Sequence, residues 1–115
     1  MLWALDDARD DDVLSVEYAY FERPEPLVWT EPGTYVATDA EFTHNTTHSW
    51  NHGLGEIVTA LFEVGFELTM LEEHDSAPWS AIPRLMVEDE FGENRLRDRP
   101  WRLAQTYTLQ ARLRG

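Results

Sequence analysis

Hydrophobic and polar residues alternate along three stretches of the chain, a pattern typical of half-buried β-strands. The first stretch, Val13–Phe21, is rich in aromatic and β-branched residues and stops before Pro24 and Pro26, which cannot donate to a strand ladder. Phe66–His74 and Thr106–Leu113 alternate in the same way. We therefore predict three strands at these positions.

Shorter extended segments are predicted between the first two strands. Leu27–Trp29 and Thr34–Thr38 flank the turn sequence Glu31-Pro32-Gly33. Glu41–Thr47 contains β-branched threonines, which favour an extended backbone. The first 48 residues are thus expected to form mostly strands and turns.

One helix is predicted over Asn51–Val64, where apolar residues recur every three or four positions. Ser49 or Asn51 is expected to cap its start by accepting a hydrogen bond from a free backbone amide. Gly65 is expected to end it in a left-handed conformation. Because a predicted strand follows at once, this region is an αβ unit.

The connection between the last two predicted strands, Ser76–Ala104, is irregular and holds three prolines and a predicted turn at residues 90–93. Connections of this length are uncommon between neighbouring strands. They usually carry function or an additional hairpin, so we expect one of the two in this segment.

Composition narrows the class of protein. The 115 residues suffice for one small domain, and 22 acidic against nine basic residues give a net charge of -13. Such a charge repels phosphate backbones and anionic membranes, so we expect neither nucleic acid nor membrane as partner. The absence of cysteine excludes disulfides and thiolate metal sites. No apolar run reaches the ~20 residues of a membrane span, and Met1–Asp7 lacks the basic region of a signal peptide, so we expect a soluble cytoplasmic protein.

Three histidines, His44, His48 and His52, are spaced four residues apart. On a helix they would share one face and could ligate zinc, but the β-branched residues of segment 43–47 disfavour a helix there. On an extended chain His44 and His48 would lie about 13 Å apart, at roughly 3.3 Å per residue, which is too far for one metal ion. We therefore predict no metal and interpret the histidines as surface or pocket-lining side chains.

Two further features allow more than one interpretation. Gly53-Leu54-Gly55 resembles a nucleotide-binding glycine loop, but no strand precedes it and Val58 occupies the third glycine position, so close helix packing is favoured over anion binding. Several aromatic residues are predicted to form the core, with an apolar ligand pocket as the alternative. They are Tyr18, Tyr20, Phe21, Trp29, Tyr35, Trp50 and Trp79.

Taken together, segment 47–68, which reads THSWNHGLGEIVTALFEVGFEL, resembles the last helix and sixth strand of bacterial class I S-adenosylmethionine-dependent methyltransferases of the ubiquinone-biosynthesis type. Further segments resemble one small-molecule subgroup of that family, in the same order along nearly the whole chain. They are Tyr20-Phe-Glu, Glu25-Pro-Leu, Glu31-Pro-Gly-Thr-Tyr, Asp39-Ala-Glu-Phe-Thr-His, Glu73-His-Asp, Glu88-Asp-Glu and Tyr107-Thr-Leu-Gln-Ala.

The resemblance implies an α+β fragment of the α/β methyltransferase fold, formed as a single domain by residues 1–115. Residues 1–48 would be an inserted, strand-rich lid over the acceptor pocket, and residues 49–115 the last helix with the antiparallel sixth and seventh strands. The methyl donor is held upstream in this family, so no cofactor site is expected here and Gly53-Leu54-Gly55 does not correspond to the donor loop. A small-molecule acceptor pocket is expected, with His44, His48, Trp50, Asn51 and His52 as candidate residues.

The same resemblance has a consequence for assembly. In the family the seventh strand lies between the fifth and the sixth, so Thr106–Leu113 is expected to have an unpaired edge here. Exposed edges recruit other chains, and we expect either a homo-oligomer or a partner that supplies the donor-binding half. The main alternative is a free-standing binding or oligomerisation module without catalysis. A small hydrolase or isomerase that uses the histidines is a third, less favoured reading.

Overall fold

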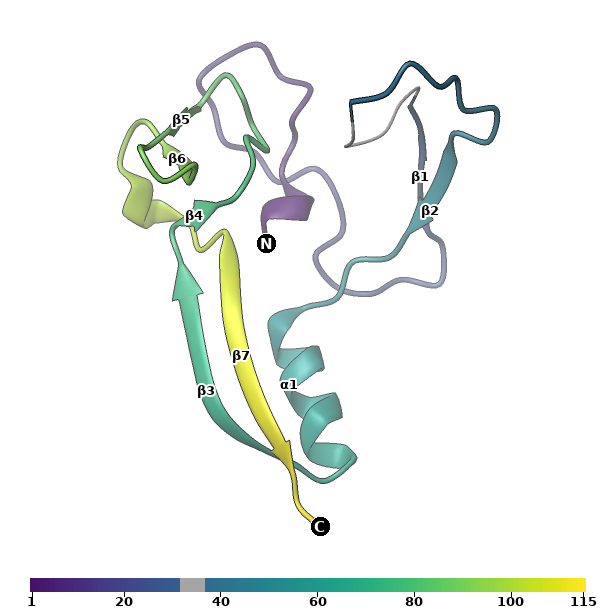
Figure 1. Cartoon of the computed structure of the whole chain (residues 1–115), viewed down its shortest axis with the longest axis vertical. Coiled ribbons are helices and arrows are strands. Elements are labelled where there is room, and N and C mark those ends of the chain that lie inside the picture. The colour runs from purple at the N-terminus through teal and green to yellow at the C-terminus, as the bar shows by residue number, and fades with distance from the viewer. Residues whose placement is uncertain (32–36) are drawn as a thin grey trace.

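A computed structural model describes residues 1–31 and 37–115, which form a mixed α and β structure with three small antiparallel sheets (Figure 1). The predicted strand Thr34–Thr38 and its turn fall largely outside the described residues. The helices are η1 (Leu2–Ala4), α1 (Leu54–Glu63) and η2 (Pro100–Arg102). The strands are β1 (Leu27–Thr30), β2 (Thr46–Ser49), β3 (Phe66–His74), β4 (Ser76–Ala77), β5 (Met86–Glu88), β6 (Asn94–Leu96) and β7 (Thr106–Leu113).

The predicted helix and the two strands after it are present. Helix α1 begins three residues later than predicted, and β3 and β7 have the predicted bounds. Gly65 follows the helix with φ of +90°, a left-handed conformation that side chains rarely adopt. Strands β3 and β7 pair antiparallel from Phe66↔Leu113 to His74↔Thr106, with one irregularity between Leu68 and Met70.

Helix α1 packs against β3, and Figure 1 shows it beside the β3–β7 pair. Leu68 of β3 and its register partner Ala111 of β7 are half-buried, whereas Leu113 at the end of β7 is exposed. No side chain of α1 is fully buried. The physical reason is that a two-stranded sheet is too narrow to cover the apolar stripe of a helix completely.

The start of α1 differs from the prediction. Neither Ser49 nor Asn51 caps it; Gly53 is the N-cap residue and offers no side-chain bond. Instead, the Leu54 N–H donates to the Tyr20 hydroxyl over 3.0 Å. Gly53 is buried against the same ring, since an added Cβ would lie 3.3 Å from Tyr20 Cε1. Close packing is therefore confirmed at Gly53 but is wrong for Gly55, which is exposed and where an added Cβ would meet nothing within 4 Å.

The predicted strand Val13–Phe21 is wrong. Only an isolated bridge between Leu5 and Val16 forms there. The backbone amides of Glu17 and Tyr18 both donate to Ala4 O in η1, at 2.8 and 3.0 Å. The segment alternates apolar and polar residues as a strand would. Its amides at Glu17 and Tyr18 nevertheless bond to the short helix η1 and not to a neighbouring strand.

Strand β1 extends the predicted Leu27–Trp29 by one residue, and its partner is β2. The register runs from Leu27↔Ser49 to Thr30↔Thr46. The extended segment predicted at Glu41–Thr47 is therefore regular strand only from Thr46 onward. Pairing places residues 46–49 beside β1, and this strand pair forms part of the site described below.

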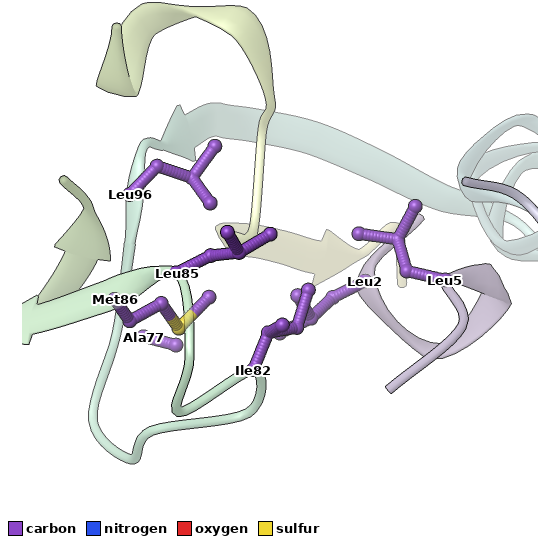
Figure 2. Packing of buried hydrophobic residues seen from close by; sticks show 7 residues of the cluster. All are labelled: Leu2, Leu5, Ala77, Ile82, Leu85, Met86 and Leu96. Atoms are coloured by element: carbon purple, nitrogen blue, oxygen red, sulfur yellow. The ribbon is translucent and has the colours of Figure 1, made fainter. Parts of the chain in front are cut away.

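The buried core contains no residue of α1, and Figure 2 shows its side chains packed together. Segment 76–104, predicted as irregular, contains the β4–β6–β5 sheet, and its β5–β6 hairpin turns through Gly92 at φ +79°. Apolar side chains of this segment meet Leu2 and Leu5 from the N-terminus. The cluster consists of Leu2, Leu5, Ala77, Ile82, Leu85, Met86 and Leu96. Contacts between distant parts of the sequence therefore hold the N-terminal segment against residues 77–96.

Among the described residues, no helix combines the length and the apolar character needed to cross a membrane.

Candidate ligand-binding cavity

A half-open cavity of about 810 Å³ lies between the N-terminal helix η1, the β1–β2 pair and the loop at residues 79–82. Its volume is in the range of about 300–1,000 Å³ that small-molecule sites occupy. The described residues that line it are Leu2, Trp3, Leu5, Asp7, Tyr18, Leu27, Trp29, Glu31, Phe42, His44, Asn45, Thr47, Ser49, Trp50, Asn51, Trp79, Ser80, Ala81 and Ile82.

The β1–β2 pair forms one wall of this cavity because side chains alternate between the two faces of a strand. Leu27 and Trp29 of β1 line the cavity, as do Thr47 and Ser49 of β2. His48, which pairs with Val28 in the register, is exposed and does not line it. The strand period thus separates His48 from the cavity.

Aromatic rings form part of the cavity lining. Trp3 and Trp79 are stacked with ring centroids 5.7 Å apart and an interplanar angle of 27°. Tyr18 and Trp29 meet edge to face, with centroids 5.2 Å apart. These pairs join the N-terminus to the 79–82 loop and the 18–20 segment to β1.

The aromatic residues are therefore not the core that the sequence predicted. Four of the predicted set, Tyr18, Trp29, Trp50 and Trp79, line the cavity, and none belongs to the buried cluster. Tyr20 caps α1, and Phe21 is 74% exposed. Tyr35 lies outside the described residues. The pocket interpretation, which the sequence ranked second, describes most of these side chains better.

Hydrogen bonds fix the segment that joins β2 to α1. The Asn51 side-chain amide donates to Ala19 O over 3.0 Å, and its oxygen accepts from the His52 N–H. Trp50 Nε1 donates to Pro24 O over 3.4 Å. Both side chains line the cavity, so these bonds hold one part of its wall in place.

The charged groups at the cavity are acidic. Asp7 and Glu31 contribute carboxylates to the lining. The pKa of the Tyr18 phenol is raised above its ordinary value, first because burial disfavours the phenolate and then because Asp7, Asp6 and Glu17 repel its negative charge. His44 joins these groups on the lining, at the end of the loop before β2.

His52 lies outside this cavity and forms a separate surface group with Glu22 and Glu56. Its Nδ1 atom is 3.2 Å from Glu56 Oε1 and 3.7 Å from Glu22 Oε2. The hydrogen bond to His52 is the first cause that lowers the pKa of the Glu56 carboxyl. One ligand atom from each residue lies within 4.8 Å of the others, which is close enough for a metal ion.

This group of three residues was not predicted from the sequence, because Glu22 is thirty residues from His52 along the chain. Its three members are all exposed, so water competes for any cation there. Among the described residues the zinc alternative of three histidines does not form: His44 faces the cavity, His48 the outer side of β2, and His52 the two glutamates.

Of the five candidate site residues, the fold brings His44, Trp50 and Asn51 to one cavity and leaves His48 and His52 outside its lining. Residues that the sequence reasoning missed are Trp3, Asp7 and Glu31. No local signal marks them, since they reach the cavity only through long-range packing. Searches against protein-family models, curated proteins and solved structures find no match to this chain.

Proposed function

We propose that this chain is the C-terminal, acceptor-side portion of an S-adenosylmethionine-dependent methyltransferase that acts on a small molecule, and that it is inactive alone. The sequence resemblance motivates this function. The observation that carries it is the order of α1, β3 and β7, in which a helix is followed by a strand that pairs antiparallel with a distant last strand. In the family, the last helix and the sixth and seventh strands have this order.

The cavity supports the acceptor role. In methyl transfer the enzyme chiefly holds a nucleophile in line with the sulfonium methyl group, so a site that orients the acceptor and removes water is required. An aromatic-lined cavity of about 810 Å³ can orient a small molecule in this way. His44, Trp50 and Asn51 belong to the proposed acceptor site, together with Trp3, Trp29 and Trp79.

The edge of β7 supports the need for a partner. Strands β3 and β7 form a two-stranded sheet, so within the described residues no strand pairs with the outer edge of β7. We propose that this edge receives either the fifth strand of a donor-binding half or the same edge of a second copy. Both arrangements would satisfy the free backbone groups of β7 and widen the sheet under α1.

A free-standing binding or oligomerisation module is the second candidate. The buried core around Ile82 favours it, because this core forms from residues of the chain itself and makes no use of the β3–β7 pair. Such a module would bind a ligand in the cavity without a methyl donor.

Calorimetric titration with S-adenosylmethionine tests the proposal. The chain alone is expected to show no binding, whereas a polypeptide that adds the sequence encoded upstream of Met1 is expected to bind the donor. Micromolar affinity of the chain alone would refute the proposed division of the two sites. An upstream sequence without a strand and glycine loop would favour the free-standing module.

A matched pair of variants then tests the acceptor site in the longer polypeptide. Trp29→Leu is expected to lower kcat/KM for methyl transfer by roughly tenfold while donor binding is unchanged, because an aromatic wall of the cavity is lost. Trp101→Leu removes a tryptophan that is 76% exposed and outside the lining, and it is expected to leave both measurements unchanged. Equal effects of the two variants would remove the cavity from the reaction.

A further inference from the structure

The charge of the cavity lining is one-sided. Asp7 and Glu31 both reach the lining, and no arginine is found among the described lining residues. The whole sequence contains no lysine, so no ammonium side chain is available to enter from elsewhere. A bound carboxylate or phosphate would therefore meet two negative groups and no fixed positive partner.

The arginines that are close in sequence to lining residues interact with groups outside the cavity lining. Arg9 forms hydrogen bonds with Asp11, and Arg23 lies 3.6 Å from Glu25. Arg84, which comes shortly after the 79–82 loop, donates to the carbonyl oxygens of Asp6 and Val13, at 3.5 and 3.0 Å. Ion pairs with acids of the β4–β6–β5 region, the η2 segment and the β3–β7 pair involve Arg95, Arg99, Arg102, Arg112 and Arg114. Arg97 is exposed and does not line the cavity.

The aromatic lining complements this negative charge. The face of an indole or phenol ring attracts a cation because the ring carries a negative quadrupole there, and tryptophan is the strongest side chain in this respect. Four tryptophans and Tyr18 contribute to the lining. Aromatic faces combined with carboxylates are the arrangement that recognises quaternary and other organic ammonium ions.

We propose that the cavity binds an organic molecule that carries an ammonium group and rejects molecules that carry a carboxylate or phosphate. The ammonium group lies against the tryptophan faces, and Asp7 and Glu31 balance its charge at the mouth of the cavity. Burial is the first cause of the raised pKa of Tyr18, and the repulsion from Asp7, Asp6 and Glu17 that adds to it is the negative field expected at this site. The inference deepens the proposed function. It rests on that function only in identifying the bound ammonium compound as the methyl acceptor.

Binding is measured with choline and two probes of nearly the same shape, neutral 3,3-dimethylbutan-1-ol and anionic 3,3-dimethylbutanoate. Four of the five tryptophans line the cavity, so intrinsic fluorescence and the indole N–H signals in NMR spectra report occupancy. Choline is expected to bind at roughly millimolar concentration, at least fivefold more tightly than the alcohol, with affinity that falls as salt is added. The indole signal of Trp101 is expected to stay in place.

Charge variants separate the carboxylates from the overall acidity of the chain. Glu31→Gln and Asp7→Asn are each expected to weaken choline binding about fivefold, the effect of one exposed charge that lies on the lining. Glu63→Gln and Asp12→Asn remove the same charge at exposed positions outside the lining, and they are expected to change the affinity less than twofold. Circular dichroism of all four variants confirms that the fold is retained.

Several outcomes would overturn the inference: no choline binding, equal binding of the neutral alcohol, tighter binding of the anion, or equal losses in the lining and control variants. None of these measurements requires a methyl donor. Failure of choline binding would therefore leave the methyltransferase proposal in place, and failure of donor binding by the longer polypeptide would leave the ammonium site in place.

Discussion

Removal of the Tyr20 hydroxyl is predicted to destabilise the junction between the cavity wall and α1. The hydroxyl accepts the Leu54 N–H over 3.0 Å, and it replaces the side-chain cap that Gly53 lacks. A lost cap costs about 1 kcal/mol, and a neutral hydrogen bond contributes a similar amount. Tyr20→Phe is therefore expected to lower the free energy of unfolding by about 1 kcal/mol, or the Tm by roughly 4 °C.

Urea unfolding followed by circular dichroism measures this loss. Tyr107→Phe is the matched control, since it removes a phenol hydroxyl from an exposed residue of β7. If Tyr20→Phe differs from the unchanged chain by no more than this control, the hydroxyl does not cap α1 and the reasoning is refuted.

A double-mutant cycle isolates the contact between the Tyr20 ring and Gly53. Gly53 has φ of -68°, so alanine fits the backbone, but its Cβ would lie 3.3 Å from the ring. Gly53→Ala is expected to cost more in the unchanged chain than in Tyr20→Ala, where the ring is absent. Any penalty of alanine as an N-cap residue appears in both backgrounds and cancels. Equal costs in the two backgrounds would show that the ring does not restrict Gly53.

Three further predictions concern the core, the acidic turn and the sheet edge. Ile82→Ala is expected to lower the free energy of unfolding by about 3 kcal/mol in the same urea assay, because this side chain is 2% exposed, whereas Val87→Ala, at 46% exposure, is expected to cost less than about 1 kcal/mol. Hydrogen bonds from Arg9 are the first cause that lowers the pKa of Asp11 to about 2, so the NMR signal of its carboxyl should titrate near this pH. Arg9→Gln should move the midpoint up toward 3.8. The stabilising contribution of the carboxylate is fully present above pH 3.8 and is lost as the pH falls through 2. Size-exclusion chromatography at micromolar concentration is expected to show a dimer or larger assembly paired through β7, and a compact monomer would contradict this.

The sequence was most informative where a local pattern and a local end signal agreed. The helical spacing before Gly65 and the alternation of Phe66–His74 and Thr106–Leu113 predicted α1, β3 and β7 to within a few residues. Glycine in a left-handed conformation ends a helix almost independently of its surroundings, so this boundary was predictable.

Prediction failed where a residue's role depends on distant parts of the chain. Val13–Phe21 has the composition of a strand, but no described strand pairs with it. Two of its backbone amides, those of Glu17 and Tyr18, donate instead to Ala4 O. Tyr20 caps a helix that begins 34 positions later, so no capping pattern near Leu54 could reveal it. The same holds for Glu22, whose approach to His52 has no signal in the sequence.

In the candidate site, too, some residues were predictable from the sequence and others were not. Sequence resemblance pointed to His44, Trp50 and Asn51. His48 faces away because it alternates with Thr47 and Ser49 in β2, whereas His44 lies in the loop before that strand and reaches the cavity from there. The amino-acid sequence by itself determined the acidity, the single long helix and the final strand pair, because these follow from composition and short-range periodicity. Tertiary structure alone decided that Asp7, Glu31 and four tryptophans share one cavity, because their proximity results from packing between segments far apart in the chain.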